Sequence, residues 1–356
     1  MFISFIKLII TRNNKKYNIN NYPYMIKYTL MFNIGNVQVN SSVTLAPMAG
    51  ITDLPYRLIC KEMGASLVVT ELVSAKGILY KNPNNKVIME TSEDEAPAAL
   101  QIFGSDPFIM SAMANRATDE YPYKIVDINM GCPVPKVVNN GEGSALLKDI
   151  ELAKRIIETM VRVLEAKKIP VTVKMRIGFD KKHINGVEFA KMCEDAGASA
   201  ITVHARCRDE YYLNEALHLD VLKEIAHSVK IPVIGSGNIF TIEDAKNMIE
   251  NIGCTGVALA RGVCGNPWFV RECREYLENN KKIDRPKSSE IKDMIFKHLE
   301  LMSKYKSIHV TVQEMRKHIA WYTKSLPGST KFRQKLNDIT DIEYLKEYIN
   351  SYFENL

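Results

Sequence analysis

From residue 43 onward, short runs rich in β-branched residues alternate with longer amphipathic stretches, and this alternation constrains the fold more than any other feature. Strands are expected at residues 43–47, 66–70, 98–103, 125–129, 171–175, 200–204, 233–236 and 256–260. Helices are expected at residues 54–63, 107–120, 149–167, 186–196, 219–228, 241–251 and 268–278. The pattern is weakest around residues 73–80. Eight strands joined by helical crossovers predict an α/β protein with a closed (β/α)8 TIM barrel.

An open, doubly wound sheet is the main alternative to this barrel. Such a sheet usually has fewer strands and a glycine-rich turn after its first strand. Here the first expected strand is followed by Met48-Ala49-Gly50, without a G-x-G-x-x-G pattern. The closed barrel is therefore favoured.

The length of the chain leaves room for a smaller domain after the barrel. Its 356 residues are 46% hydrophobic and 25% charged, which is typical of a soluble globular protein. We expect a barrel at residues 31–284 and a small all-helical domain at residues 285–356. Helices of that domain are expected at residues 291–304, 311–325 and 342–353.

The first 30 residues contain five Lys or Arg and no acid, so they hold most of the net charge of +6. Their apolar run is interrupted by Lys7 and is too short to cross a bilayer. It also lacks the basic start and the small-residue cleavage site of a signal peptide. Residues 1–30 are expected to be a poorly ordered extension, or the product of a start codon upstream of Met31. We expect a cytoplasmic protein with no membrane contact.

Seven cysteines occur, with no Cys-x-x-Cys pair and no histidine spacing typical of zinc ligands, so reduced thiols and no metal are expected. Cys132 is distinctive because it follows an expected strand within Asn129-Met130-Gly131-Cys132-Pro133. The glycine lets the backbone approach a ligand, and the proline fixes the loop. A buried cysteine can equally be a small apolar filler. Both interpretations of Cys132 stay open on position alone.

Polar residues follow most of the expected strands, at the end where barrel active sites lie. They are Glu71, Gln101, Asn129, Lys174, Arg176, His204, Arg206, Asn238 and Arg261, while the first expected strand is followed by Met48-Ala49. Lys174 interrupts an apolar run where the strand should still be buried. A buried lysine costs several kcal/mol unless it is paired. Lys174 is therefore expected to face a ligand.

Glycines follow the last two expected strands, in Gly235-Ser236-Gly237 and Arg261-Gly262. Barrels bind phosphate at this position, with backbone N–H groups and an arginine directed at the anion. The alternative is that these glycines only permit tight turns. A phosphate here, a polar ring near Gln101 and Lys174, and a stacking surface at Met48 would suit a flavin mononucleotide.

Five segments in this order resemble the tRNA-dihydrouridine synthases, and their bacterial B-type branch fits best. The segments are LAPMAGITD at 45–53, LQIFG at 100–104, NMGCPVPK at 129–136, KMRIG at 174–178 and GNPW at 265–268. The resemblance covers residues 31 to about 333, including EMRKH at 314–318 and LPG at 326–328. Departures from the family pattern include Cys207 in place of threonine, Ser236 in place of asparagine, and Ala260 where glycine is common.

The resemblance implies an enzyme that binds FMN, takes electrons from NADPH and saturates the C5=C6 bond of selected uridines in tRNA. It implies FMN contacts from Pro47, Met48, Ala49, Gln101, Lys174, His204, Gly237, Asn238, Arg261 and Gly262. Hydride would reach C6 of the uracil, and Cys132 would act as the general acid that protonates C5. The uracil edge would be bound by Asn129 and Arg176. Lys136 would contact the RNA backbone or lower the pKa of the thiol.

The segment from residue 303 to residue 335 contains eight Lys or Arg and only one acid, Glu314. The cations are Lys304, Lys306, Arg316, Lys317, Lys324, Lys331, Arg333 and Lys335, with Tyr305, Trp321, Tyr322 and Phe332 interleaved. A uridine must leave its stack to reach a barrel mouth, which requires surface to hold the RNA. We expect this segment to bind RNA phosphates, with Arg316, Lys317 and, from the barrel, Arg206 among the substrate contacts. An ordinary solvated helical face with core aromatics is the alternative.

Other functions stay open. A dihydrouridine synthase could act on ribosomal RNA, and an FMN barrel such as a dihydropyrimidine or dihydroorotate dehydrogenase would share the barrel and the phosphate site. An RNA-binding scaffold without activity is a further alternative. No obligate protein partner is implied, and no residue discriminates NADPH from NADH.

Overall fold

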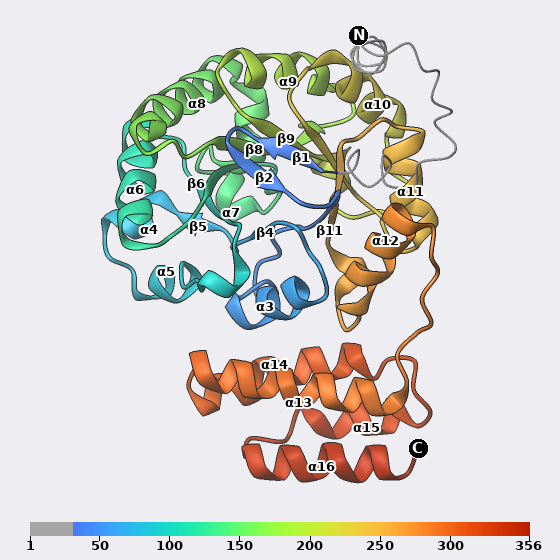
Figure 1. Cartoon of the computed structure of the whole chain (residues 1–356). Helices are drawn as coiled ribbons and strands as arrows, with labels where there is room; N and C mark the ends of the chain where they lie inside the picture. Colours follow the sequence, from blue (N-terminus) through green and yellow to red (C-terminus); the bar gives the residue numbers. More distant parts are fainter. Residues whose placement is uncertain (1–30) are drawn as a thin grey trace, which may run out of the picture.

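The computed structural model describes residues 31–356, so the expected extension at residues 1–30 lies outside the described residues. Eight parallel strands form a nearly closed barrel with helices around it (Figure 1), which confirms the predicted TIM barrel. The strands are β3 (Val43–Leu45), β4 (Val68–Val69), β6 (Ala98–Phe103), β7 (Ile125–Met130), β8 (Val171–Gly178), β9 (Ala200–Cys207), β10 (Val233–Ser236) and β11 (Gly256–Leu259).

Neighbouring strands of the barrel are hydrogen-bonded in the order β3-β11-β10-β9-β8-β7-β6-β4. The circle closes between β4 and β3, where the Leu45 N–H donates to the Leu67 carbonyl at 2.9 Å. The Ser66 N–H donates to the Val43 carbonyl at the same distance. A short strand, β5 (Val73–Ser74), extends the pairing along β6. All strand ends that carry polar residues therefore meet at one mouth.

The outer helices are α3 (Leu54–Glu62), α4 (Ala75–Leu79), α5 (Pro83–Ile88), α6 (Pro107–Glu120), α8 (Ile150–Leu164), α9 (Gly186–Asp195), α10 (Leu219–Ser228), α11 (Ile242–Glu250) and α12 (Trp268–Asn279). Several begin at a capping side chain. Asp53 accepts from the Tyr56 N–H at the start of α3, and Asp106 accepts from the Phe108 and Ile109 N–H groups of α6. Thr241 and Asp244 form a capping box on α11.

An antiparallel hairpin, which the strand pattern did not predict, precedes the barrel. It pairs β1 (Phe32–Ile34) with β2 (Val37–Val39). It lies across the barrel (Figure 1). Ile34 and Val39 are fully buried in a cluster with interior residues of the barrel strands, such as Ala99 and Ile234. The hairpin therefore supplies the apolar side chains that fill one end of the barrel interior, leaving the opposite mouth for a ligand.

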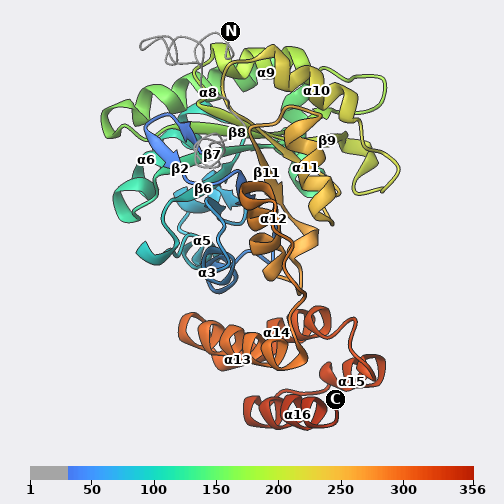
Figure 2. The ribbon, with the colours of Figure 1, turned by 45° about the vertical axis from the view of Figure 1, so that its right-hand side comes forward.

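The C-terminal residues form four helices that make a separate layer beside the barrel (Figures 1 and 2). They are α13 (Ser288–Tyr305), α14 (Ile308–Tyr322), α15 (Ser329–Leu336) and α16 (Ile342–Glu354). Residues 280–287, which form no helix or strand, connect them to α12. Their own apolar core includes Ile295, Met315 and Ile349, and it extends onto Ile59 and Trp268 of the barrel. We call this layer the helical domain.

Polar contacts also join the helical domain to the barrel. Lys306 lies 2.6 Å from Asp53 and also pairs with Glu314. Lys317 donates to the carbonyl of Gly50, next to the cavity-lining Ala49. The two parts also touch closely at Gly265, where a Cβ would lie only 2.3 Å from the backbone of Trp321. Within residues 31–356, no helix is both long and apolar enough to cross a membrane.

Candidate active site

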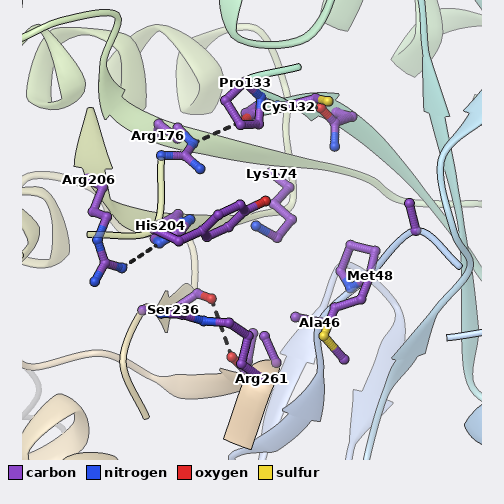
Figure 3. Close-up of a pocket in the computed structure, with 18 of the residues that line it drawn as sticks. Ala46, Met48, Cys132, Pro133, Lys174, Arg176, His204, Arg206, Ser236 and Arg261 are labelled. Carbon is purple, nitrogen blue, oxygen red and sulfur yellow. Dashed lines mark hydrogen bonds between the residues drawn. The ribbon is translucent and has the colours of Figure 1, made fainter. Parts of the chain in front are cut away.

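A cavity of about 370 Å³ opens at the C-terminal ends of the barrel strands (Figure 3). All ten residues expected to contact FMN line it, and so do Asn129, Cys132, Arg176 and Arg206. Figure 3 shows Lys174, Arg176 and His204 around the same space as Cys132 and Met48. The fold thus gathers fourteen of the seventeen expected site residues, from seven different strands and the loops after them, into one cavity.

The cavity is strongly cationic. Lys174, Arg176, Arg206 and Arg261 line it, whereas no Asp or Glu does. The Lys174 amine has no hydrogen-bond or ion-pair acceptor among residues 31–356. Burial, followed by the repulsion of Arg176, lowers the pKa of Lys174 to about 8. A charge held at this cost is expected where a bound anion or polar ring compensates it.

Two arginines converge on Asn238, in the turn after β10. Arg206 donates to the Asn238 side-chain oxygen at 2.7 Å, and Arg261 donates to the same atom at 3.0 Å. Gly237, just before it, has a φ of +124°, a conformation that favours glycine. At Gly262 an added Cβ would lie 2.4 Å from the Ile239 carbonyl, so no side chain can cover this backbone. Two guanidinium groups beside bare backbone form a suitable cradle for a phosphate.

His204 is held neutral beside this cradle. Its Nε2 accepts from Arg206 at 2.9 Å, because a guanidinium can only donate. Burial holds the pKa of His204 well below its usual range, and the cations Arg176, Lys174, Arg206 and Arg261 lower it further. His204 can therefore offer its other ring nitrogen as a donor without adding a charge to the cavity.

A chain of hydrogen bonds links the floor of the cavity to the loop that carries Cys132. Asp127 accepts from Thr172 and from the Gln101 amide, both at 2.6 Å. Asn129 donates to the Gln101 oxygen at 2.9 Å, and its own oxygen accepts from the Cys132 N–H at 2.9 Å. Because Asp127 only accepts when ionised, it fixes which end of the Gln101 amide faces each neighbour.

The thiol of Cys132 is held on a loop fixed from both sides. Besides the N–H bond to Asn129, the Cys132 carbonyl accepts from the Ser144 hydroxyl at 2.8 Å and from the Ser144 N–H at 3.1 Å. The residue is only 7% exposed. Burial raises the pKa of Cys132, while Arg176 and Lys174 oppose this effect only in part. Near neutral pH the thiol is therefore protonated and can give its proton away.

Arg176 is tied to the backbone of two loops. Its Nε donates to the Gly131 carbonyl at 2.9 Å, and its Nη1 donates to the carbonyls of Cys207 and Tyr211 at 2.8 and 3.0 Å. Its Nη2 reaches the Tyr211 carbonyl at 3.1 Å. These contacts use four of the five N–H groups of a guanidinium and leave one for a ligand.

Three expected substrate contacts lie outside the cavity. Lys136 lines a neighbouring pocket with Lys76 and Glu142. It is also not among the groups that shift the pKa of Cys132, so that part of its expected role has no support here. Arg316 donates to the Ile339 carbonyl within the helical domain, at 2.6 Å from its Nη2. Lys317 contacts the loop after β3 through Gly50.

The basic segment at residues 303–335 divides into two groups. Lys306, Arg316, Lys317 and Arg333 make contacts within the protein, whereas Lys304, Lys324, Lys331 and Lys335 are exposed. Two of the aromatics interleaved in this segment, Tyr322 and Phe332, are buried. These two are 4% and 3% exposed because they pack in the core of the helical domain.

The sequence patterns predicted neither Tyr212 nor Asp127 as part of the site. Tyr212 lines the cavity, with its ring centroid 5.6 Å from the Arg176 guanidinium and 5.5 Å from that of Arg261. Asp127 lies two positions before Asn129 on β7, so both face the barrel interior. Strand alternation counted backward from Asn129 would have found Asp127. Nothing in the local sequence places Tyr212 over the cavity.

Fold and cavity together define a TIM barrel whose mouth is lined by four cationic side chains and a buried thiol. Known structures share this fold. A histamine dehydrogenase from Rhizobium sp. 4-9 matches with a TM-score of 0.53 and 11% identity, covering 79% of this chain and 51% of that one. A 6-hydroxypseudooxynicotine amine oxidase from Pseudomonas geniculata N1 matches with a TM-score of 0.55 and 12% identity. This match covers 74% of this chain and 51% of the oxidase chain.

Sequence relatives are more specific. The dihydrouridine synthase (Dus) family model matches residues 44–355. The chain is 37% identical over 320 residues to tRNA-dihydrouridine synthase B of Pseudomonas syringae pv. tomato, covering 90% of this chain and 94% of that protein. A probable tRNA-dihydrouridine synthase of Rickettsia conorii is also 37% identical, over 92% of this chain and 97% of its own length. The chain therefore belongs to the dihydrouridine synthase family, and its resemblance to the B-type branch is confirmed.

Proposed function

We propose that this protein is a cytoplasmic, FMN-dependent tRNA-dihydrouridine synthase that takes its electrons from NADPH. It would be an oxidoreductase that reduces the C5=C6 bond of selected uridines in tRNA. The observation that carries the proposal is the cavity itself. Lys174, which has no acceptor among residues 31–356, and the arginine pair on Asn238 lie in the same cavity as a buried, protonated thiol, in a chain of the Dus family.

The cavity suits FMN in two respects. Arg206, Arg261 and the bare backbone at Gly237 and Gly262 would hold the phosphate. Because Arg206 shares Asn238 with Arg261, it is better suited to this phosphate than to RNA. The polar edge of the flavin ring would meet Gln101, Lys174 and His204, with the loop at Pro47, Met48 and Ala49 against the ring. When bound and reduced, the flavin supplies the hydride that C6 of the uracil needs.

Cys132 would complete the reduction as the general acid. It holds its proton because burial raises its pKa, and its loop is fixed by Asn129 and Ser144. Together with the hydride at C6, a proton delivered from Sγ to C5 would convert the double bond into a single bond and leave a thiolate at Cys132. Lys174 and Arg176 stabilise the thiolate, because both lower the pKa of this group. A solvent proton then restores the thiol.

Asn129 and Arg176 would position the uracil. Asn129 has one N–H left after its bond to Gln101, and Arg176 has one left after its bonds to the two loops. Both can donate to uracil carbonyl oxygens, and a donor at such an oxygen also withdraws electron density from the reacting bond. The flanking RNA would be held by Lys136, Lys317 and the exposed lysines of the helical domain, and the uridine would be flipped into the cavity.

The test is a map of dihydrouridine in total RNA from cells with and without the gene, followed by re-expression of the wild-type or the Cys132→Ala protein. We expect specific tRNA positions to lose dihydrouridine and to regain it only with the wild type. Loss confined to ribosomal RNA would support the ribosomal alternative. Unchanged dihydrouridine in all RNA, from a protein that binds flavin, would support a small-molecule reductase and overturn the proposal.

A further inference from the structure

Three side chains outside the cavity converge at the end of β9. Cys207 ends this strand, Glu210 lies in the 3-10 turn Arg208–Glu210, and His218 precedes α10. Their thiol, carboxylate and imidazole ligand atoms all lie within 4.8 Å of one another. We infer that these residues form a metal site for Zn²⁺ or a cation of similar preference, which joins the two ends of the loop at residues 208–218. None of the three lines the flavin cavity.

The ligand types decide which cation fits. Sulfur and imidazole nitrogen favour zinc over magnesium or calcium, which prefer oxygen ligands throughout. Three protein ligands also leave a fourth position of a tetrahedral site for water. The set differs from the Cys-x-x-Cys pairs that are recognisable in a sequence, because its residues are three and eight positions apart and only the fold brings them together.

Hydrogen bonds already orient two of the ligands. The Glu210 carboxylate accepts from the Cys207 N–H at 2.8 Å through Oε2 and lies 2.9 Å from His218 Nε2 through Oε1. Movement of His218 Nε2 from the carboxylate to a cation would need only a small displacement.

The charge around the thiol also favours a cation. Glu210, Asp209 and Asp180 are the acids close enough to act on the thiol of Cys207, and Arg176 is the cation that opposes them. Lys181 lies 3.8 Å from Glu210 but is 67% exposed, so it screens the carboxylate only weakly. A divalent ion would neutralise this group of acids, and its binding would release the thiol proton to solvent.

The loop between the metal ligands also forms part of the cavity wall. The loop between its ligands carries Tyr211, whose carbonyl accepts from Arg176, and Tyr212, whose ring lies beside Arg176 and Arg261. A cation bound at both ends of this loop would reduce its freedom and hold Tyr212 over the cavity. The cation would therefore act on substrate access without touching the reacting atoms.

The experiment uses the full-length protein, stripped of metal and titrated with Zn²⁺ against a chromophoric chelator. We expect one tight site per chain in the wild type and binding about 100-fold weaker or less in Cys207→Ser and in His218→Asn. His227→Asn, which alters an exposed histidine on α10, the helix that follows His218, is the matched control and should bind as the wild type does.

Substitution of Co²⁺ for zinc gives a second, independent readout. A thiolate-to-cobalt band in the difference spectrum should persist in Cys132→Ala and disappear in Cys207→Ser. A wild type that binds Zn²⁺ no more tightly than Cys207→Ser, or a cobalt band that survives in Cys207→Ser, would overturn the inference. Neither readout depends on RNA or on flavin chemistry, so the inference stands or falls separately from the proposed function.

Discussion

The cavity and the interface between the barrel and the helical domain are both rich in basic side chains, but they compensate their charge differently. At the interface, Lys306 lies 2.6 Å from Asp53 and also pairs with Glu314. In the cavity, Lys174 has no acceptor among the described residues and no acid lines the wall. Cations that stabilise the fold thus have their partners within the chain. A cation that binds a ligand, as we propose for Lys174, has no acidic partner within the described residues, and this lowers the stability of the ligand-free protein.

The largest expected effect on stability is at the interface. Lys306→Met would leave Asp53 and Glu314 beside each other without a cation, at a site where the lysine side chain is only 10% exposed. Removal of one partner from a buried ion pair costs about 3–5 kcal/mol. We expect the free energy of unfolding to fall by about that amount in denaturant titration, while the folded fraction still binds flavin. Lys297→Met, which breaks an exposed pair with Glu62, should cost less than about 1 kcal/mol.

A Lys→Met substitution in the cavity should change the free energy of unfolding in the opposite direction. The pKa of Lys174 is lowered from 10.5 to about 8, so its charge destabilises the flavin-free fold by at most about 3 kcal/mol at neutral pH. Lys174→Met should therefore stabilise the flavin-free protein in thermal unfolding. It should also weaken FMN binding by about 10- to 100-fold, because it removes a charge-assisted hydrogen bond.

The pH dependence isolates this effect. Below about pH 8 both the folded and the unfolded wild type carry the Lys174 proton, and the destabilisation is complete. Between about pH 8 and 10.5 only the unfolded state keeps that proton, so the wild type gains stability relative to Lys174→Met. A stability difference that stays constant over this range would contradict the assignment of an uncompensated charge.

A smaller effect is expected from the chain of hydrogen bonds below the cavity. Asp127→Asn removes the charge that orients the Gln101 amide but keeps its shape, and its side chain is only 4% exposed. We expect FMN binding to weaken and turnover to fall by about 10-fold, consistent with about 1.4 kcal/mol for one reoriented hydrogen bond. Flavin fluorescence titration and steady-state rates would measure both. Unchanged values would show that Gln101 needs no orienting partner.

The smallest effect is expected on the exposed face of the helical domain. Single Lys324→Gln, Lys331→Gln and Lys335→Gln substitutions should leave stability and flavin binding unchanged. Each lysine that contacts a phosphate should lower the salt dependence of tRNA affinity by about one unit of slope. Filter binding over a salt series would measure the slope. Three unchanged slopes would place the RNA on another surface.

Much of the fold followed from periodicity, and the differences have physical causes. Helix α6 begins and ends as predicted, because Asp106 and Pro107 start it and an amphipathic face continues over 14 residues. Helices α4 and α5 have five and six residues, too few to develop an amphipathic period, and α15 lies within a basic run. Strands β8 and β9 continue to Gly178 and Cys207, beyond the predicted ends, with an irregular register between Arg176 and Gly178.

The candidate site was predicted as far as strand ends could define it. The rule that polar residues meet at the barrel mouth gathers Gln101, Lys174 and His204 correctly into one cavity. It misses Asp127, which lies inside a strand, and Tyr212, which reaches the cavity through a long loop. In the helical domain, the sequence alone could not distinguish the ion-paired Lys306 from the exposed lysines. The partner of Lys306 is Asp53, about 250 positions away in sequence.

The central claim is that Cys132 donates the proton in a flavin-dependent reduction of uridine in tRNA. Its most direct test is the anaerobic oxidation of the reduced flavoprotein by unmodified tRNA in a single turnover. Cys132→Ala should bind flavin normally and react about 10²- to 10⁴-fold more slowly, the usual contribution of a general acid. Cys264→Ala, which removes a partly exposed thiol outside the cavity, should react as the wild type does. An undiminished rate in Cys132→Ala would contradict the claim.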